Sequence, residues 1–512
     1  MSSDKKNHRI SLRPLRAELT APEGAALRDL LFEQGVEFPC GGQGRCRGCR
    51  VRILEGTAEV NVAQRERLSE DELANGWRLA CQCAVAGDLV IELRQWDAAI
   101  LVDETPFAFQ PREGLGVAVD VGTTTLVAQL LDLESGRVLG VRTALNAQAR
   151  YGADVMSRVE FALRQPGDQR QLEELIRRQI GSLIVQLLSA ANRSGAEVRD
   201  VVLVGNTVMH HLFCGFSVAP LAHYPFQPEQ MGLASFHASE VVWDHLGGSR
   251  IRFLPCLGGF VGSDLLAGIL ATKLAESENL LGLVDLGTNG EIVIGSREKI
   301  LCASTAAGPA FEGARISMGM RAATGAISEV TREREGVKCH VLGNVAPRGL
   351  CGSGLVDTVA VGLDLGVIDA SGRLANGHNP WPLCPPVSLT QNDVRELQLA
   401  KAAIAAGLRI LRERWGGAGL SRLYLAGAFG NYIKRASAQR IGLLDFPPDK
   451  VEAAGNTALL GAKLALFSLD GEDGSYAGLR RRVEHVALNA TPRFQDVFVE
   501  ELAFPQNSLA PE

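Results

Sequence analysis

The pattern of hydrophobic and polar residues changes once along the chain, near residue 116. Before that point, short alternating apolar segments separated by turns predict strands over 9–15, 49–54 and 89–93 and a helix over 26–33. After it, apolar strands that end in glycine turns alternate with long amphipathic helices, which is typical of an α/β architecture. We therefore expect a small α+β domain followed by a larger α/β region.

Two of the long helices have clear bounds in the sequence. Apolar residues recur at helical spacing over 172–191, and this stripe should simply pack on a sheet. A second helix is expected over 393–415, with Thr390 as its N-cap and Gly416 at its end. Neither helix requires a functional interpretation.

Length and local composition predict where the domains meet. The 512 residues are enough for about three domains of ordinary size. Residues 96–115 lose periodicity and contain Pro106 and Pro111, which is typical of a linker. The expected organisation is therefore a first domain over 1–95, the linker 96–115 and an α/β domain over 116–512.

Charge and hydropathy exclude several classes of partner. The formal net charge is −6 with 21% charged residues, so the chain lacks the basic surface that nucleic-acid binding requires. No apolar run approaches 18 residues and the first ten residues contain no apolar core of a signal peptide. Eleven cysteines in a chain of this length are too few for a disulfide scaffold. We expect a cytoplasmic protein without a membrane partner.

Four cysteines in the first domain have the spacing of an iron–sulfur loop. Cys40, Cys46 and Cys49 lie within ten residues, and Cys81 follows much later. Three ligands on one glycine-rich loop and a fourth from a distant segment are typical of a [2Fe–2S] cluster. Together with the strand pattern, this spacing resembles ferredoxins of the adrenodoxin and plant types, which have the β-grasp fold. The protein is therefore predicted to move single electrons.

Zinc is the main alternative for these cysteines. Structural zinc sites usually have two short cysteine pairs or added histidine, and here Cys81 has only Cys83 nearby. We interpret Cys83 as a neighbour of the ligands, because such clusters usually have four. The remaining cysteines form no C-x-x-C pair and are expected to be small buried hydrophobic residues.

A strand followed by Asp-x-Gly-Thr occurs twice in the α/β region. The first copy begins at Asp120 and the second at Asp285, 165 residues later. Glycine and hydroxyl residues in such a turn expose donors that can surround a phosphate, and the aspartate can face a hydrated Mg²⁺. One copy alone is also an ordinary hairpin turn, but two copies at domain spacing predict two related subdomains that face one another across a cleft.

Two further strands end at this type of position. A strand over 423–426 leads into the glycines Gly427 and Gly430, and such a turn can pass beneath a nucleoside. A strand over 201–204 ends at Gly205. His210 and His211 follow it, and we interpret them as packing or helix-capping residues.

These motifs resemble those of a known family. The two Asp-x-Gly-Thr turns and the late glycine turn are similar to the superfamily of acetate and sugar kinases, Hsp70 and actin. Joined to a [2Fe–2S] domain, they resemble the reductive activators of corrinoid proteins over nearly the whole chain. The more specific similarities lie at 146–148, 151–155, 205–212 (Gly-Asn-Thr-Val-Met-His-His-Leu), 259–264, 305–314 and 351–355.

The resemblance implies a fold and a set of site residues. It implies a β-grasp ferredoxin domain followed by an actin-like ATPase with two RNase H-like subdomains. The implied metal ligands are Cys40, Cys46, Cys49 and Cys81 for the cluster. Asp120 and Asp285 would face Mg²⁺ and phosphate. Asp264 is the first candidate for the water-activating residue and Glu312 the second. The implied nucleotide-binding residues are Gly122, Thr123, Thr124, Thr125, Gly287, Thr288, Asn289, Gly290, Gly427 and Gly430.

The resemblance also implies an activity and its partners. Such activators use ATP to return an inactive Co(II) corrinoid to Co(I) for methyl transfer. The sequence has no Asp-x-His-x-x-Gly corrinoid motif, so the cobalt should reside on another protein. The expected cofactors are a [2Fe–2S] cluster, ATP and Mg²⁺. The expected partners are a corrinoid protein of a methyltransferase system and a low-potential donor such as a ferredoxin, a flavodoxin or a reductase, with a homodimer as a further assembly to test.

Three alternative functions are compatible with the sequence. An ATP-dependent activator of another low-potential enzyme would use the same ATPase fold, although such activators generally carry a [4Fe–4S] cluster. A redox-regulated kinase would use the cluster as a sensor and phosphorylate a small metabolite. A module that binds ATP without turnover is a third, non-enzymatic alternative. Measuring ATP hydrolysis with and without a corrinoid protein distinguishes this third alternative.

Overall fold

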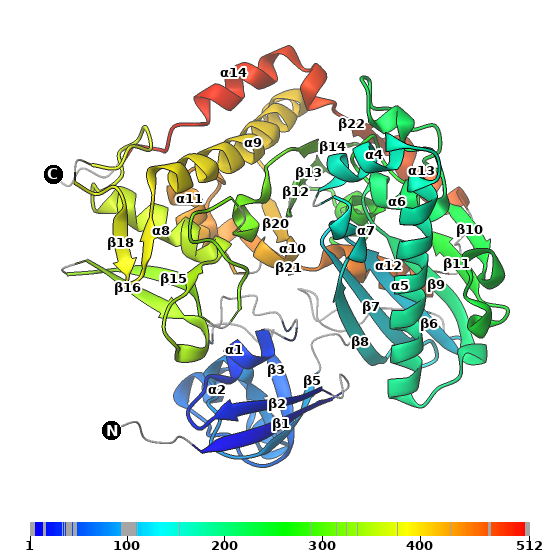
Figure 1. Cartoon of the computed structure of the whole chain (residues 1–512), viewed down its shortest axis with the longest axis horizontal. Coiled ribbons are helices and arrows are strands. Elements are labelled where there is room, and N and C mark those ends of the chain that lie inside the picture. The colour runs from blue at the N-terminus through cyan, green and yellow to red at the C-terminus, as the bar shows by residue number, and fades with distance from the viewer. Residues whose placement is uncertain are drawn as a thin grey trace.

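The N-terminal part of the chain forms a five-stranded mixed sheet (Figure 1). Its strands lie in the order β2-β1-β5-β3-β4, and β1 and β5 form the one parallel pair. Ile10 and Ile91 from this pair pack against Leu27 and Leu31 of α1. The elements are β1 (Asn7–Arg13), β2 (Ala17–Pro22), α1 (Leu27–Phe32), β3 (Arg50–Glu55), α2 (Val62–Arg67), α3 (Glu70–Ala74), β4 (Trp77–Leu79) and β5 (Leu89–Leu93). This is the expected β-grasp arrangement, and the predicted strands and helix are confirmed.

The structure is a computed structural model that describes most of the chain. The described residues are 6–13, 17–32, 34, 36, 44, 49–93, 109, 111–152, 154–287, 289–313, 315–323, 325–334, 336–375, 377–430, 432–468 and 473–506. Most of the predicted linker, 96–115, lies outside them. Phe109 is described, and its ring lies 4.6 Å from that of Phe467.

The first RNase H-like subdomain contains a six-stranded sheet in the order β10-β11-β9-β6-β7-β8. The strands β6, β7 and β8 are antiparallel, and β9 and β11 continue the sheet in parallel with β6. Its strands are β6 (Leu115–Val121), β7 (Thr125–Asp132), β8 (Val138–Leu145), β9 (Val198–Val204), β10 (Ala234–His237) and β11 (Arg250–Phe253). The helices of its outer layer are α4 (Val155–Arg164), α5 (Asp168–Ala191) and α6 (Thr207–Cys214). The helix predicted over 172–191 is α5.

The second subdomain repeats this arrangement. Its sheet has the order β21-β20-β12-β13-β14-β22, with β12, β13 and β14 antiparallel and β20 parallel to β12. The strands are β12 (Leu281–Leu286), β13 (Gly290–Gly295), β14 (Ile300–Thr305), β20 (Arg422–Ala426), β21 (Val451–Gly455) and β22 (Val483–His485). The outer face is covered by α9 (Gln391–Trp415), which begins after the N-cap Thr390 and ends at Gly416 as predicted. Five strands of each sheet follow the same order, and the sixth, β10 or β22, lies on opposite edges of the two sheets. The shared order of five strands confirms the expected pair of RNase H-like subdomains.

Two helices lie between the sheets. They are α7 (Ser263–Ala271) and α12 (Thr457–Phe467), and they share one apolar core with strands of both subdomains (Figure 1). The helices cross so closely that a Cβ on Gly461 would lie 2.1 Å from the carbonyl oxygen of Ala267. This packing joins the sheet that contains β6 to the sheet that contains β12.

The remaining elements flank the second subdomain. The helix α8 packs against β15 of a small sheet. These elements are β15 (Ala326–Glu333), β16 (Gly336–Val341), β17 (Gly349–Leu350), α8 (Gly352–Asp364), β18 (Trp381–Cys384), β19 (Val387–Leu389), α10 (Gly427–Gly430), α11 (Arg435–Arg440), α13 (Asp473–Arg482) and α14 (Pro492–Glu500). None of the described helices is long and apolar enough to cross a membrane.

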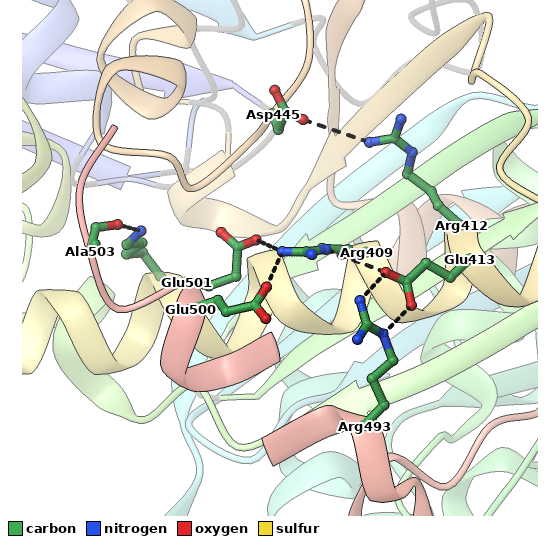
Figure 2. Close-up of polar contacts among 9 residues, drawn as sticks. Arg409, Arg412, Glu413, Asp445, Arg493, Glu500, Glu501 and Ala503 are labelled. Carbon is green, nitrogen blue, oxygen red and sulfur yellow. Dashed lines mark hydrogen bonds and ion pairs between the residues drawn. The ribbon is translucent and has the colours of Figure 1, made fainter. Parts of the chain in front are cut away.

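Ion pairs fasten the C-terminal helix α14 to α9 (Figure 2). Arg409 of α9 lies 2.9 Å from Glu500 and 3.1 Å from Glu501. Arg493 of α14 forms two hydrogen bonds with Glu413 of α9, at 2.8 and 3.1 Å. Because the pairs form a network rather than isolated contacts, they fix how the end of the chain lies along the second subdomain.

Candidate functional site

Cys49 and Cys81 lie next to each other at one edge of the first sheet. Cys49 directly precedes β3, and Cys81 lies in the 3₁₀ helix η1 (Ala80–Gln82), which follows β4. The amide of Ala80 donates a 3.0 Å hydrogen bond to the carbonyl of Cys49. The antiparallel pairing of β3 and β4 therefore brings these two predicted ligands together. The other two, Cys40 and Cys46, lie outside the described residues.

The side chain of Gln82 joins the cluster loop to η1. Its Nε2 donates to the sulfur of Cys81 at 3.6 Å. Gly44 of the loop lies so close that a Cβ there would be 2.9 Å from Cδ of Gln82. Donors that point at cysteine sulfur are typical of iron–sulfur sites, where they tune the reduction potential. The described part of this site therefore fits a [2Fe–2S] cluster.

Cys83 has a different environment from Cys81. Its sulfur is buried and donates to the carbonyl of Leu79 at 3.4 Å. Burial raises the pKa of the Cys83 thiol to about 12. A protonated, hydrogen-bonded thiol agrees with the interpretation of Cys83 as a neighbour, which remains a prediction.

The turn between β6 and β7 is the first predicted phosphate turn, and its carbonyl groups are all held by other residues. The side-chain amide of Asn146 donates to the carbonyl oxygen of Gly122, and its backbone amide donates to the carbonyl oxygen of Thr124. Both distances are 2.9 Å. The buried guanidinium of Arg158 donates to the carbonyl of Thr123. A Cβ on Gly122 would lie 2.4 Å from the carbonyl oxygen of Thr125, so this tight turn requires glycine. The conformation of the turn is thus fixed before any ligand binds.

The turn after β9 contacts both the first predicted phosphate turn and the start of α7, which contains Asp264. The amide of Ser263 donates to the carbonyl of Gly205 at 2.9 Å, and Asn206 donates to the hydroxyl of Thr123 at 2.8 Å. A Cβ on Gly262 would lie 2.2 Å from the same Gly205 oxygen. Close contact of three glycine turns therefore places Asp264, in the first turn of α7, beside the end of β6.

The second phosphate turn carries two acidic residues, because Asp285 of β12 lies directly opposite Glu291 of β13. The amide of Gly287 donates to the carbonyl of Asn289 at 3.1 Å and closes the turn. Gly290 begins β13, and Thr288 lies outside the described residues. The register thus presents both carboxylates at the strand ends beside this turn.

The predicted adenosine turn contacts the second phosphate turn directly. Gly427 follows β20 with a φ of +85°, and a Cβ there would lie 2.6 Å from Oδ1 of Asp285. Parallel pairing of β12 with β20 sets this register, since Asp285 is the partner of Ala426. Glycine is required at position 427 for both the backbone conformation and the close approach.

A residue of the second subdomain reaches the first. Asn456, the N-cap of α12, accepts from the amide of Leu459 at 2.8 Å. Its Nδ2 donates to Oδ2 of Asp120 at 2.9 Å. The contact orients Asp120 and links the two predicted Asp-x-Gly-Thr subdomains.

Four carboxylates from both subdomains influence one another beside the two predicted phosphate turns. Burial raises the pKa of Asp120 to about 6 and that of Asp285 to about 7. Burial is also the main cause that raises the pKa of Asp264, with Asp120 adding to it, and that of Glu291, with Asp264 and Asp285 adding to it. None of the four forms an ion pair with a described residue. The site therefore holds negative charge that only a cation or protons can compensate.

The arrangement fits Mg²⁺ bound together with a nucleotide. In the part of the chain that the structure describes, no three His, Cys, Asp or Glu residues lie close enough to bind one metal ion among themselves. Mg²⁺ usually keeps several waters and takes its other ligands from one or two carboxylates and from substrate phosphates. Asp120 and Asp285, one from each phosphate turn, would hold it in this way.

The structure separates the two candidates for activating water. Asp264 belongs to the interacting carboxylates. Glu312 ends the 3₁₀ helix η8 (Pro309–Glu312), whose Phe311 stacks on Phe429 of the adenosine turn at 4.7 Å. Asp264 therefore stays the first candidate and Glu312 the second, and the role of each remains a prediction. His210 and His211 are buried in α6, as expected for packing residues.

Sequence reasoning missed several residues of this site. Glu291 follows the second turn, and only the hairpin register with Asp285 reveals its position. Asn456 comes after a short strand and before an apolar helix, which is an ordinary N-cap signal. Arg158 lies in α4, far in sequence from the first predicted phosphate turn, and its side chain contacts that turn only because α4 packs beside it.

Comparison with protein families identifies all three parts of the chain. Residues 10–86 match the family described as "2Fe-2S iron-sulfur cluster binding domain". Residues 115–277 match "RACo middle region", and residues 279–512 match "C-terminal domain of RACo the ASKHA domain".

Named relatives cover most of the chain. The "Corrinoid activation enzyme RamQ" of Eubacterium limosum is 34% identical over 438 residues, which are 80% of this chain and 73% of the relative. The "[Co(II) methylated amine-specific corrinoid protein] reductase" of Methanosarcina barkeri is 27% identical over 425 residues, 76% of this chain and 77% of the relative. A solved structure described as "Reductive activator for corrinoid,iron-sulfur protein" has a TM-score of 0.70 at 27% identity and covers 98% of both chains.

Proposed function

Because this chain belongs to the RACo family of reductive activators for corrinoid proteins, we propose that it uses ATP to drive one electron onto the Co(II) corrinoid of a partner protein. One observation carries the proposal. The same chain holds a cysteine site suited to a [2Fe–2S] cluster and a group of buried carboxylates to which Asp120 and Asp285 belong, one from each predicted phosphate turn. An electron carrier and an ATPase in one chain are what ATP-driven electron transfer requires.

At the ATPase cleft, the residues bind and orient the nucleotide. Gly122 to Thr125 and Gly287 to Gly290 surround its phosphates, and Gly427 and Gly430 lie beneath the adenosine. Mg²⁺, when bound, neutralises the charge on the phosphates. Asp264 takes the proton from the attacking water, and its raised pKa suits a base that works near neutral pH.

At the ferredoxin domain, Cys40, Cys46, Cys49 and Cys81 hold the cluster. When bound, the cluster supplies the single electron that converts Co(II) to Co(I), and a low-potential donor replaces that electron. Gln82 donates to the sulfur of Cys81 and so stabilises the charge on the ligand. None of the nine cysteines among the described residues forms a disulfide, and we place the activity in the reducing cytoplasm.

ATP is needed because the electron moves uphill. A plant-type [2Fe–2S] centre lies near roughly −400 mV, and Co(II)/Co(I) couples of protein-bound corrinoids generally lie lower. For one electron, each ~59 mV of mismatch reduces the Co(I) population about tenfold. Closure of the two subdomains around ATP changes how the chain holds its partner, and the differential affinity of the two states supplies the missing free energy.

The test mixes the reduced protein with a Co(II) corrinoid protein under anaerobic conditions. Co(I) absorbance is followed with MgATP, with MgADP and without nucleotide. Co(I) that forms only with MgATP would support the proposal. ATP consumption without Co(I) for any corrinoid partner would favour another electron acceptor or the kinase function.

A further inference from the structure

The helix α1 of the ferredoxin domain faces the second subdomain (Figure 1). Asp29 of α1 is buried and accepts a 2.8 Å hydrogen bond from the amide of Gly343, in the 3₁₀ helix η9 (Leu342–Asn344). His340 of β16 lies 3.8 Å from the same carboxylate and also contacts Arg28. The cluster domain is therefore docked through specific polar contacts.

A second contact joins the cluster domain to the adenosine turn. The hydroxyl of Tyr432 donates to the carbonyl of Val36 at 3.1 Å, and its ring packs against the core of the ferredoxin domain. Tyr432 is two residues beyond Gly430, and Val36 is four residues before Cys40. This contact thus joins a residue close in sequence to the predicted nucleotide site with a residue close in sequence to the predicted cluster loop.

The backbone of Tyr432 is held by the adenosine turn itself. Its amide donates to the carbonyl of Phe429 at 3.0 Å. Phe429 in turn stacks on Phe311, and a Cβ on Gly352 would lie 3.0 Å from its ring. The turn and Tyr432 are therefore one packed unit, and a change in the turn is passed to the hydroxyl that contacts Val36.

We propose that Tyr432 is a positioning residue that couples occupancy of the adenosine turn to the docking of the cluster domain. The proposal rests on the proposed function, because it requires a nucleotide at Gly427 to Gly430. Nucleotide orders the turn, and the ordered turn holds Tyr432 against Val36 and keeps this part of the cluster domain docked. Loss of nucleotide loosens this contact, while the contact of Asp29 with Gly343 remains.

The experiment measures amide hydrogen exchange on the full-length protein with and without magnesium and the non-hydrolysable analogue AMPPNP. Tyr432→Phe removes only the hydroxyl. Tyr476→Phe is the matched control, since the buried hydroxyl of Tyr476 has no hydrogen-bond partner among the described residues. Exchange at 427–430 reports nucleotide binding, and exchange over 27–36 reports docking.

Wild-type protein and Tyr476→Phe should show nucleotide-dependent protection in both segments. Tyr432→Phe should keep its protection at 427–430. Its protection factors over 27–36 with nucleotide should be about fivefold lower than in the wild type, which corresponds to ~1 kcal/mol for one hydrogen bond. Equal protection over 27–36 in all three proteins would overturn the role of Tyr432. Absence of any nucleotide effect at 427–430 in the wild type would overturn both proposals, and it would identify the nucleotide site as the failure.

Discussion

Asn456 donates a 2.9 Å hydrogen bond to the carboxylate of Asp120, and this contact crosses from the second subdomain to the first. The same side chain caps α12 through Leu459. The position of α12 between the sheets is therefore tied to the first phosphate turn. A change in the position of Asp120 should therefore alter the N-cap of α12, which packs between the two subdomains.

We predict that Asn456→Asp lowers kcat/KM for ATP hydrolysis at least tenfold. Aspartate is an equally good N-cap, so α12 should keep its stability. A second carboxylate about 3 Å from Asp120 costs several kcal/mol at an effective dielectric constant of ~20, which exceeds the ~1.4 kcal/mol of a tenfold change. The rate is measured as phosphate release. Asn192→Asp, the same change at the exposed C-cap of α5, should leave it unchanged.

Asp264→Asn should lower kcat for ATP hydrolysis about 100-fold while the affinity for MgATP changes little. A general base contributes about 10²–10⁴-fold, and asparagine has nearly the same shape without the basic oxygen. Glu312→Gln is the comparison, with an expected change below threefold. Steady-state kinetics and nucleotide titration together separate turnover from binding. The reverse order of effects would assign the base to Glu312.

Gly427→Ala should weaken nucleotide binding at least tenfold. The new Cβ would meet Asp285 at 2.6 Å and would hold a backbone φ of +85°, which disfavours alanine. Gly416→Ala is the matched control, because Gly416 has a φ of +103° but no atom within 4 Å of the added Cβ. Both variants place alanine at a positive φ, but only in Gly427→Ala does the added Cβ clash with Asp285. Equal affinities in a titration with a fluorescent ATP analogue would contradict the placement of the adenosine turn.

Much of this fold can be predicted from the sequence because the spacing of hydrophobic residues indicates which positions are buried. The bounds of α9 were predictable from Thr390 and Gly416, since caps are local signals. The repeated turns at Asp120 and Asp285 were predictable because the Asp-x-Gly-Thr motif is also a local signal. Glu291 and Asn456 were not, because their roles depend on strand register and on a contact between subdomains. The Tyr432–Val36 contact depends on docking of two domains and leaves no local pattern.

The carboxylates predict a dependence of stability on pH. Asp285 keeps its proton up to about pH 7 in the folded protein, against an ordinary value of 3.8. The native state therefore binds more protons than the unfolded state between these values, and stability decreases as the pH rises through this window. Asp285→Asn removes the charge, so it should raise the apparent melting temperature at pH 8 by about 2–4 °C for each kcal/mol relieved.

At pH 4 the same variant should melt close to the wild type, because Asp285 is then protonated in the native state. The comparison uses nucleotide-free protein in EDTA. Adding MgATP at pH 8 should stabilise the wild type more than Asp285→Asn, since the cation compensates the charge that the variant lacks. A lower melting temperature for Asp285→Asn at pH 8 would contradict the clustering of the carboxylates.

The most direct measurement follows Co(I) on a corrinoid protein at a fixed donor potential above that of its Co(II)/Co(I) couple. Wild type and Cys83→Ser should accumulate Co(I) only when MgATP is present. Cys81→Ser should form none although it still hydrolyses ATP, since it lacks one proposed cluster ligand. The same Co(I) yield with and without MgATP in the wild type would contradict ATP-driven electron transfer by this chain.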